Sequence, residues 1–186
     1  TKLLHEGRNT LTFYLAPGFY EEYGYGTAKL SWDIAITYKD GNTQHFYPDG
    51  TEKYTRYHVK EADVIRGEAH DYTDCTEVWE NTVIHEAPDT CYFLQDCPSD
   101  RVIRKLTPHY LGNKGIIRVP IGSIFVEKQY SAKLVIIKSN KAQKITVRYS
   151  ELLNEDGTLD EMHIYGQHTD YITDDNERIL HPEFPW

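Results

Sequence analysis

The sequence predicts an all-β protein made of two consecutive antiparallel β-sandwich modules. Short segments alternate between apolar and polar residues, as strands with one buried face do. Turn sequences such as Asp40-Gly41, Asp49-Gly50 and Asp156-Gly157 separate these segments. Helical periodicity of useful length is absent, and many short strands between such turns are typical of β-sandwiches.

The first half of the chain begins with an expected strand over residues 10–15, in which Leu11, Phe13 and Leu15 share one face. A segment rich in glycine and tyrosine follows at residues 16–26. Its proline and glycines exclude a regular strand or helix there, so we expect an irregular aromatic loop. Such a loop is either a ligand platform or a packed crossover.

Residues 28–47 predict a β-hairpin, because both arms alternate around the Asp40-Gly41 turn. A polar strand over 51–60 and a segment over 64–72 complete the predicted strands of this half. The pattern decays between residues 86 and 100, which favours a boundary near residue 95 and modules over 1–95 and 96–186.

The second half is expected to hold short strands near residues 102–106, 115–119, 124–126 and 133–137. Its clearest strand starts at Lys144, where Ile145, Val147 and Tyr149 alternate with polar residues. A turn at residues 154–157 and a further strand near Tyr171 follow.

Composition limits the classes of function. With 39% hydrophobic and 26% charged residues, the 186-residue chain is ordinary for a soluble globular protein. The net charge is −9 and the basic residues are scattered, which disfavours a nucleic-acid partner. No apolar run approaches the ~20 residues of a membrane span, and no signal peptide opens the chain, so both ends are expected to be domain edges.

The residues do not form a recognisable catalytic motif. The nine histidines are dispersed, and no nucleophile triad, phosphate loop or zinc-ligand spacing is visible. Glycoside hydrolysis needs two carboxyl groups across one bond, and the sequence does not show that any two acidic residues converge. Cys75, Cys91 and Cys97 leave at least one thiol unpaired, and their spacing does not establish a disulfide.

Ordered sequence pieces along the whole chain resemble a bacterial family. They include Leu3-Leu4 followed by Gly7-Arg8-Asn9, the triplet Gly18-Phe19-Tyr20, the Gly67-Glu68 pair before Asp71, Leu106-Thr107-Pro108, and the block from Tyr149 to Asp170 with Pro182 and Phe184. Together they are similar to the non-catalytic N-terminal β-sandwich region of bacterial α-L-rhamnosidase-like glycoside hydrolases. Phe19 stands where the family usually has tryptophan, and Val119-Pro120-Ile121-Gly122 keeps only the glycine of an Asp-Phe-Gly pattern.

The resemblance implies jelly-roll or concanavalin-like sandwiches, with the first one incomplete, that precede a catalytic (α/α)₆ barrel outside this chain. It implies no catalytic residue in the chain itself and no required cofactor. The expected role is accessory carbohydrate binding or scaffolding of that barrel, with rhamnose-containing glycans as the ligand and a periplasmic or extracellular bacterial location. Purely structural packing, a lectin-like module of another polysaccharide-degrading enzyme, and a hydrolase in its own right remain alternatives.

The candidate carbohydrate-binding residues are aromatic or acidic. Aromatic faces stack on sugar rings while carboxylates bind hydroxyl groups, and the candidates are Phe19, Tyr20, Tyr23, Tyr25, Glu68 and Asp71. Glu68 and Asp71 are also candidate calcium contacts. They follow Gly67 and are three residues apart, so their carboxylate oxygens are expected to converge on a hard cation. Capping of a turn is the structural alternative for this pair.

Overall fold

The computed structural model describes residues 3–16, 18–63, 65–86, 89, 91, 93, 96, 109–110, 117–118, 137–148, 150, 152–160, 162 and 166–184. These residues are nearly all strand, turn or loop, which confirms the all-β prediction. The one helix among them has four residues, α1 (Phe19–Glu22). The strands of the first half are β1 (Ile34–Thr37), β2 (Thr43–Phe46), β3 (Lys53–Tyr54), β4 (Val59–Asp63), β5 (Gly67–Asp71) and β6 (Glu80–Asn81).

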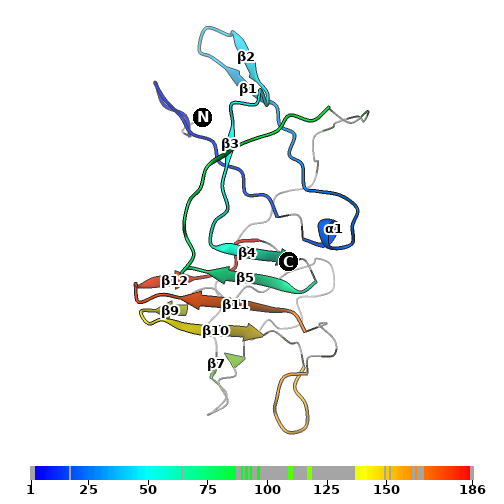
Figure 1. Ribbon diagram of the computed structural model, residues 1–186, viewed down its shortest axis with the longest axis vertical. Helices are drawn as coiled ribbons and strands as arrows, with labels where there is room; N and C mark the ends of the chain where they lie inside the picture. The colour runs from blue at the N-terminus through cyan, green and yellow to red at the C-terminus, as the bar shows by residue number, and fades with distance from the viewer. Residues whose placement is uncertain are drawn as a thin grey trace.

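The strands of the second half are β7 (His109–Tyr110), β8 (Ile117–Arg118), β9 (Ile137–Ser139), β10 (Gln143–Arg148), β11 (His168–Thr173) and β12 (Arg178–Leu180). The largest sheet has the order β10-β11-β5-β4, and the remaining strands pair two by two: β1-β2, β3-β6, β7-β8 and β12-β9. Figure 1 shows the β1-β2 hairpin at one end of the long axis and the four-stranded sheet towards the other.

The four-stranded sheet combines strands from both halves of the sequence. Its outer pairs, β10-β11 and β4-β5, are antiparallel, whereas β11 runs parallel to β5 with Thr169 opposite Glu68 and Tyr171 opposite His70. The amide of Tyr72 extends this ladder by donating to the carbonyl of Ile172 at 2.9 Å. The division of the chain into two modules at residue 95 stays a prediction. Strands from both proposed modules take part in this sheet.

One face of the sheet is buried, and it carries polar side chains. The alternation predicted around Lys144 is confirmed, because Ile145 and Val147 are the half-buried positions of β10. Their partners across the ladder are Tyr171 and Thr169, which are buried at 2% and 0% exposure. Glu68 and His70 continue the same face on β5, so the centre of the sheet buries a carboxylate and an imidazole.

Some expected elements differ from the structure. The strand expected over residues 10–15 is wrong, because these residues form no strand with the described part of the chain. Their aromatic side chains pack instead, with Phe13 against Trp32 at 6.0 Å and Tyr14 against Tyr57 at 5.2 Å between ring centroids. Alternation alone does not make a strand, since a strand also needs a hydrogen-bonded neighbour.

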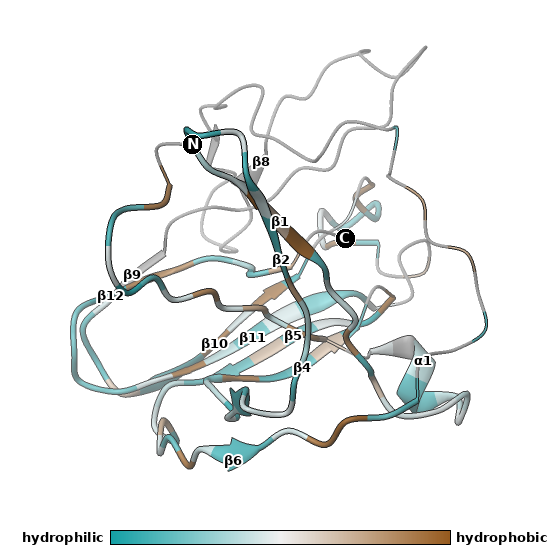
Figure 2. Ribbon diagram, turned by 90° about the horizontal axis from the view of Figure 1, so that it is seen from above, coloured by the Kyte–Doolittle hydropathy of each residue, from teal (hydrophilic) through white to brown (hydrophobic). Residues whose placement is uncertain are grey.

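The other expected strands are shorter than predicted or shifted. The hairpin over residues 28–47 is confirmed, but only β1 and β2 are paired. Figure 2 shows β1 in the brown of hydrophobic residues and β6 in the teal of hydrophilic ones. The strand over 51–60 divides into β3 and the start of β4. Of the strand expected over 133–137, only residue 137 is described, and it begins β9. The strands expected at residues 102–106 and 124–126 lie outside the described residues.

Three turns of the chain use the same side-chain arrangement. In each, an aspartate Oδ1 accepts the backbone amide of a threonine two residues later at 2.9 Å and its hydroxyl at 2.6 Å. This Asx-turn fixes the backbone without a second strand. The three turns are Asp49-Gly50-Thr51, Asp71-Tyr72-Thr73 and Asp156-Gly157-Thr158.

Gly18 allows the chain to approach the edge of the sheet closely. Its φ is +46°, and a Cβ at this position would lie 2.6 Å from the carbonyl oxygen of Ala62. We therefore expect Gly18→Ala to destabilise the protein through both backbone strain and steric overlap. The matched variant Gly24→Ala carries the strain alone, because its φ is +72° and no atom lies within 4 Å of the added carbon.

Urea unfolding separates these two effects. Gly24→Ala should lower the free energy of unfolding by about 1 kcal/mol, and Gly18→Ala by about 2–4 kcal/mol. Equal losses in the two variants would show that the contact with Ala62 is not tight.

Candidate functional site

The aromatic loop at residues 18–26 is fixed to the edge of the four-stranded sheet. The segment was expected to contain neither strand nor helix, but Phe19–Glu22 forms a single helical turn, closed by the Glu22 amide donating to the Gly18 carbonyl at 3.2 Å. A single helical turn can form here because Gly18, Gly24 and Gly26 all lie outside residues 19–22. Gly18 packs against Ala62, and Glu22 forms a 2.5 Å ion pair with Arg66, so both ends of the turn contact the β4-β5 hairpin.

Tyr20 and Tyr25 are brought together by this loop. Their ring centroids lie 5.8 Å apart at an angle of 38°, and the Tyr25 amide donates to the Tyr20 carbonyl at 3.1 Å. Gly26 lies against the ring of Tyr20, where a Cβ would be 3.3 Å from the nearest ring carbon. Tyr20 and Tyr25 are 52% and 64% exposed as residues, so they form an aromatic surface that solvent reaches.

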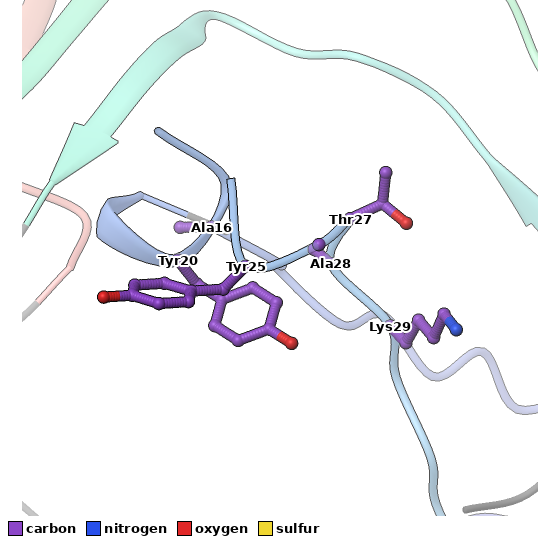
Figure 3. A pocket seen from close by; sticks show the side chains of 7 residues that line it. Ala16, Tyr20, Tyr25, Thr27, Ala28 and Lys29 are labelled. Atoms are coloured by element: carbon purple, nitrogen blue, oxygen red, sulfur yellow. The ribbon is translucent and has the colours of Figure 1, made fainter. Parts of the chain in front are cut away.

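A pocket of about 520 Å³ lies beside the two rings. Figure 3 shows Tyr20 and Tyr25 adjacent to each other, with Thr27 and Lys29 further along the loop and the Lys29 amine directed away from the rings. The site therefore offers aromatic carbon next to hydroxyl groups and one amine, which is the mixture that a polyol ligand needs. Its lining residues are Ala16, Tyr20, Tyr25, Gly26, Thr27, Ala28 and Lys29.

Of the other two predicted aromatic residues, only Tyr23 has a described side chain. Tyr23 is 57% exposed and does not line the pocket. The backbone of Phe19 begins α1, and its side chain lies outside the described part of the chain. The structure thus brings two of the four aromatic candidates together.

Glu68 is buried rather than presented to a ligand. Its side chain is 1% exposed, and one carboxylate oxygen lies 2.7 Å from His70 Nε2. The backbone amides of Glu183 and Phe184 both donate to the carboxylate at 2.8 Å. Burial raises the pKa of the carboxyl group, but the hydrogen bonds from His70 and the two amides outweigh burial, so the pKa lies below its ordinary value.

Asp71 lies on the other face of β5. Residues three apart in a strand point in opposite directions, so the carboxylates of Glu68 and Asp71 do not converge. Asp71 caps the following turn through Thr73, and these hydrogen bonds lower the pKa of its carboxyl group. Turn capping, the structural alternative for this pair, therefore describes Asp71.

The described residues contain no group of three or more histidine, cysteine, aspartate or glutamate side chains arranged for a metal ion. The Glu68 carboxylate is surrounded by N–H donors, which leave no oxygen ligands for a hard cation there. Calcium binding stays a prediction without a site in this part of the chain. Cys75 and Cys91 are free thiols, and Cys97 lies outside the described residues.

Two histidines accompany Glu68, the buried His70 and the half-buried His58, and the sequence did not single them out. His58 stacks on Tyr72 at 4.5 Å and lies 5.5 Å from His70, while His70 packs on Tyr171 at 4.7 Å between ring centroids. The Glu68-Ala69-His70 spacing could have predicted that Glu68 and His70 lie together, because residues two apart in a strand share a face. This was not predicted, since a buried face of a sheet is expected to be apolar.

The described residues form a nearly all-β structure of several antiparallel sheets, which is the class of sandwich-type all-β proteins. Residues 1–107 match the family model of the α-L-rhamnosidase N-terminal domain, which is more than half of the chain. The chain therefore belongs to this family, and it is an N-terminal, non-catalytic region of a rhamnosidase-like protein. No curated protein and no solved structure matches it.

The family match confirms the resemblance that the sequence pieces indicate, and it includes the aromatic loop, β4 and β5. Strands β7 to β12 lie beyond the matched residues. Within the described residues, no helix has the length and apolar character of a membrane span.

The hydrogen bonds of Glu68 give a prediction about stability. Replacing Glu68 with Gln keeps the shape but removes the charge and turns an NH₂ group towards N–H donors. We expect Glu68→Gln to lower the free energy of unfolding at neutral pH by about 1.5–3 kcal/mol, measured by denaturant titration. Glu61→Gln, on the exposed side of β4, is the control and should change it by less than about 0.5 kcal/mol. A similar loss in both variants would contradict the structural role of the buried carboxylate.

Proposed function

We propose that this chain is an accessory carbohydrate-binding region of an α-L-rhamnosidase-like glycoside hydrolase, with Tyr20 and Tyr25 as its sugar-stacking surface. The observation that carries the proposal is the fixed geometry of these two rings, which two contacts with the β4-β5 hairpin hold in place. A preformed site loses less conformational entropy when a ligand binds than a mobile loop does.

The chemistry of the pocket supports a sugar ligand. The C–H face of a pyranose packs on an aromatic ring, while its hydroxyl groups exchange hydrogen bonds with polar side chains at the rim. The tyrosine hydroxyls supply such groups at the rings, and Thr27 and Lys29 line the same pocket further along the loop. The proposed ligand is a rhamnose-containing glycan, as the family membership favours.

A scaffolding role is the second candidate, and exposed apolar side chains favour it. Several large hydrophobic residues of the first half are more than half exposed, and residues of this kind are available for packing on another domain. They include Leu11 at 58%, Trp79 at 55%, Val83 at 74% and Ile84 at 55%. The catalytic barrel of the parent protein is the partner that we propose for these residues.

Calorimetric titration with L-rhamnose and a methyl α-L-rhamnoside, with and without calcium, tests the binding proposal. We expect binding in the millimolar range or tighter, and Tyr20→Ala or Tyr25→Ala should weaken it about fivefold, since one stacked ring contributes about 1 kcal/mol. Tyr38→Ala is the control, because Tyr38 is similarly exposed at 48% but lies at the end of the β1-β2 hairpin.

The absence of heat at millimolar sugar would contradict carbohydrate binding and leave scaffolding as the role of the chain. Unchanged binding in the Tyr20 and Tyr25 variants would place the sugar elsewhere on the molecule. A glycan array that shows preference for other sugars would support a lectin-like module instead.

A further inference from the structure

The pocket beside Tyr20 and Tyr25, the tyrosine pocket, has one charged side chain among its described lining residues, and that side chain is a cation. The residue is Lys29, and neither aspartate nor glutamate lines the pocket. The sequence predicted carboxylates as ligand contacts, but Glu68 and Asp71 lie on β5 and outside this pocket. The polar side-chain groups of the pocket are therefore hydroxyls and one ammonium, and the ammonium donates hydrogen bonds but accepts none.

The ammonium of Lys29 is accessible to a ligand. Lys29 is exposed and makes no ion pair with any described residue. Other cations of the same half of the chain already have carboxylate partners. Arg66 is paired with Glu22 at 2.5 Å, and Lys60 is paired with Asp74 at 3.0 Å. A cation without such a partner at the wall of a pocket favours a ligand that brings a negative charge, because charge-assisted hydrogen bonds are stronger than neutral ones.

The position of Lys29 separates its contact from the stacking contact. Figure 3 shows Tyr20 and Tyr25 adjacent to each other, while Lys29 lies further along the loop with its amine directed away from the rings. Thr27 lies between them in the sequence and lines the same pocket. This arrangement suits a glycan of which one sugar stacks on the rings while the adjoining sugar reaches the amine.

The net charge of −9 does not prevent an anionic ligand from binding here. At physiological ionic strength, exposed charges more than about 8 Å apart are largely screened from each other. On the loop itself, Glu22 is neutralised by Arg66, and Glu21 is not among the lining residues. The charge that a ligand meets at the wall of the pocket is therefore that of Lys29.

We propose that the tyrosine pocket prefers an acidic glycan, in which a rhamnose stacks on Tyr20 and Tyr25 and the adjoining sugar presents a carboxylate or a sulfate to Lys29. This inference rests on the proposed carbohydrate-binding function and names the class of its ligand. The rings contribute affinity for neutral and acidic glycans alike, whereas Lys29 distinguishes between them.

Calorimetric titration of the whole chain with a rhamnosyl uronate disaccharide and with its methyl ester tests this preference. The ester has the same sugars and the same linkage but no charge. We expect the acid to bind about threefold more tightly than the ester, which is the effect of an exposed ion pair. The corresponding disaccharide with a sulfate ester in place of the carboxylate shows which anion is bound more tightly, and a preference for either anion over the neutral ester supports the proposal.

Variants of Lys29 identify the residue responsible. Lys29→Gln keeps a side chain that forms hydrogen bonds but removes the charge, so it should bind acid and ester equally. Lys29→Arg keeps the charge and should keep the preference. The control Lys39→Gln removes an exposed lysine from the turn between β1 and β2, and it should bind as the unmodified chain does.

Equal binding of the acidic disaccharides and the ester by the unmodified chain would overturn this inference and leave the proposed function intact. A preference for the acid that persists in Lys29→Gln would also overturn it, because another cation would then make the contact. If neither the acidic nor the neutral sugars bind, the proposed function fails together with this inference.

Discussion

The buried carboxylate of Glu68 is the constraint on which the described structure depends most. A buried charge is costly unless hydrogen bonds compensate it, and here an imidazole and two backbone amides do so. Each donor comes from a fixed place, since His70 lies two residues along β5 and the amides belong to the segment after β12. The carboxylate thus determines where the end of the described chain lies on the sheet.

The polar composition of the buried face makes the register of the sheet specific. A sheet buried by interchangeable aliphatic side chains tolerates a shift more easily than one in which each polar atom needs a particular partner. Thr169 opposite Glu68 and Tyr171 opposite His70 fix the alignment of β11 with β5. A similar network closes the other end of β11, where the Thr173 hydroxyl donates to the carbonyl of Lys141 at 2.6 Å.

The sequence predicts features that depend on neighbours along the chain. Alternation around Ile145 and Val147 predicts β10, and the Asp40-Gly41 turn predicts the first hairpin, because strand period and turn chemistry are local properties. The parallel pairing of β5 with β11 is not local, since about a hundred residues separate the two strands and no short motif records their contact. The role of Glu68 depends on that contact, so its spacing from Asp71 suggested a ligand site that the fold does not assemble.

The aromatic loop shows the same division between local and long-range information. Its tyrosines could be singled out from composition, but their geometry depends on Gly18 and on the Arg66 ion pair, both of which contact the β4-β5 hairpin. Ala62, the residue that Gly18 approaches, lies opposite Glu68 in the ladder of β4 and β5. The proposed sugar surface and the buried carboxylate of Glu68 therefore depend on one pair of opposite residues, Ala62 and Glu68. A change that shifts β4 relative to β5 would disturb both.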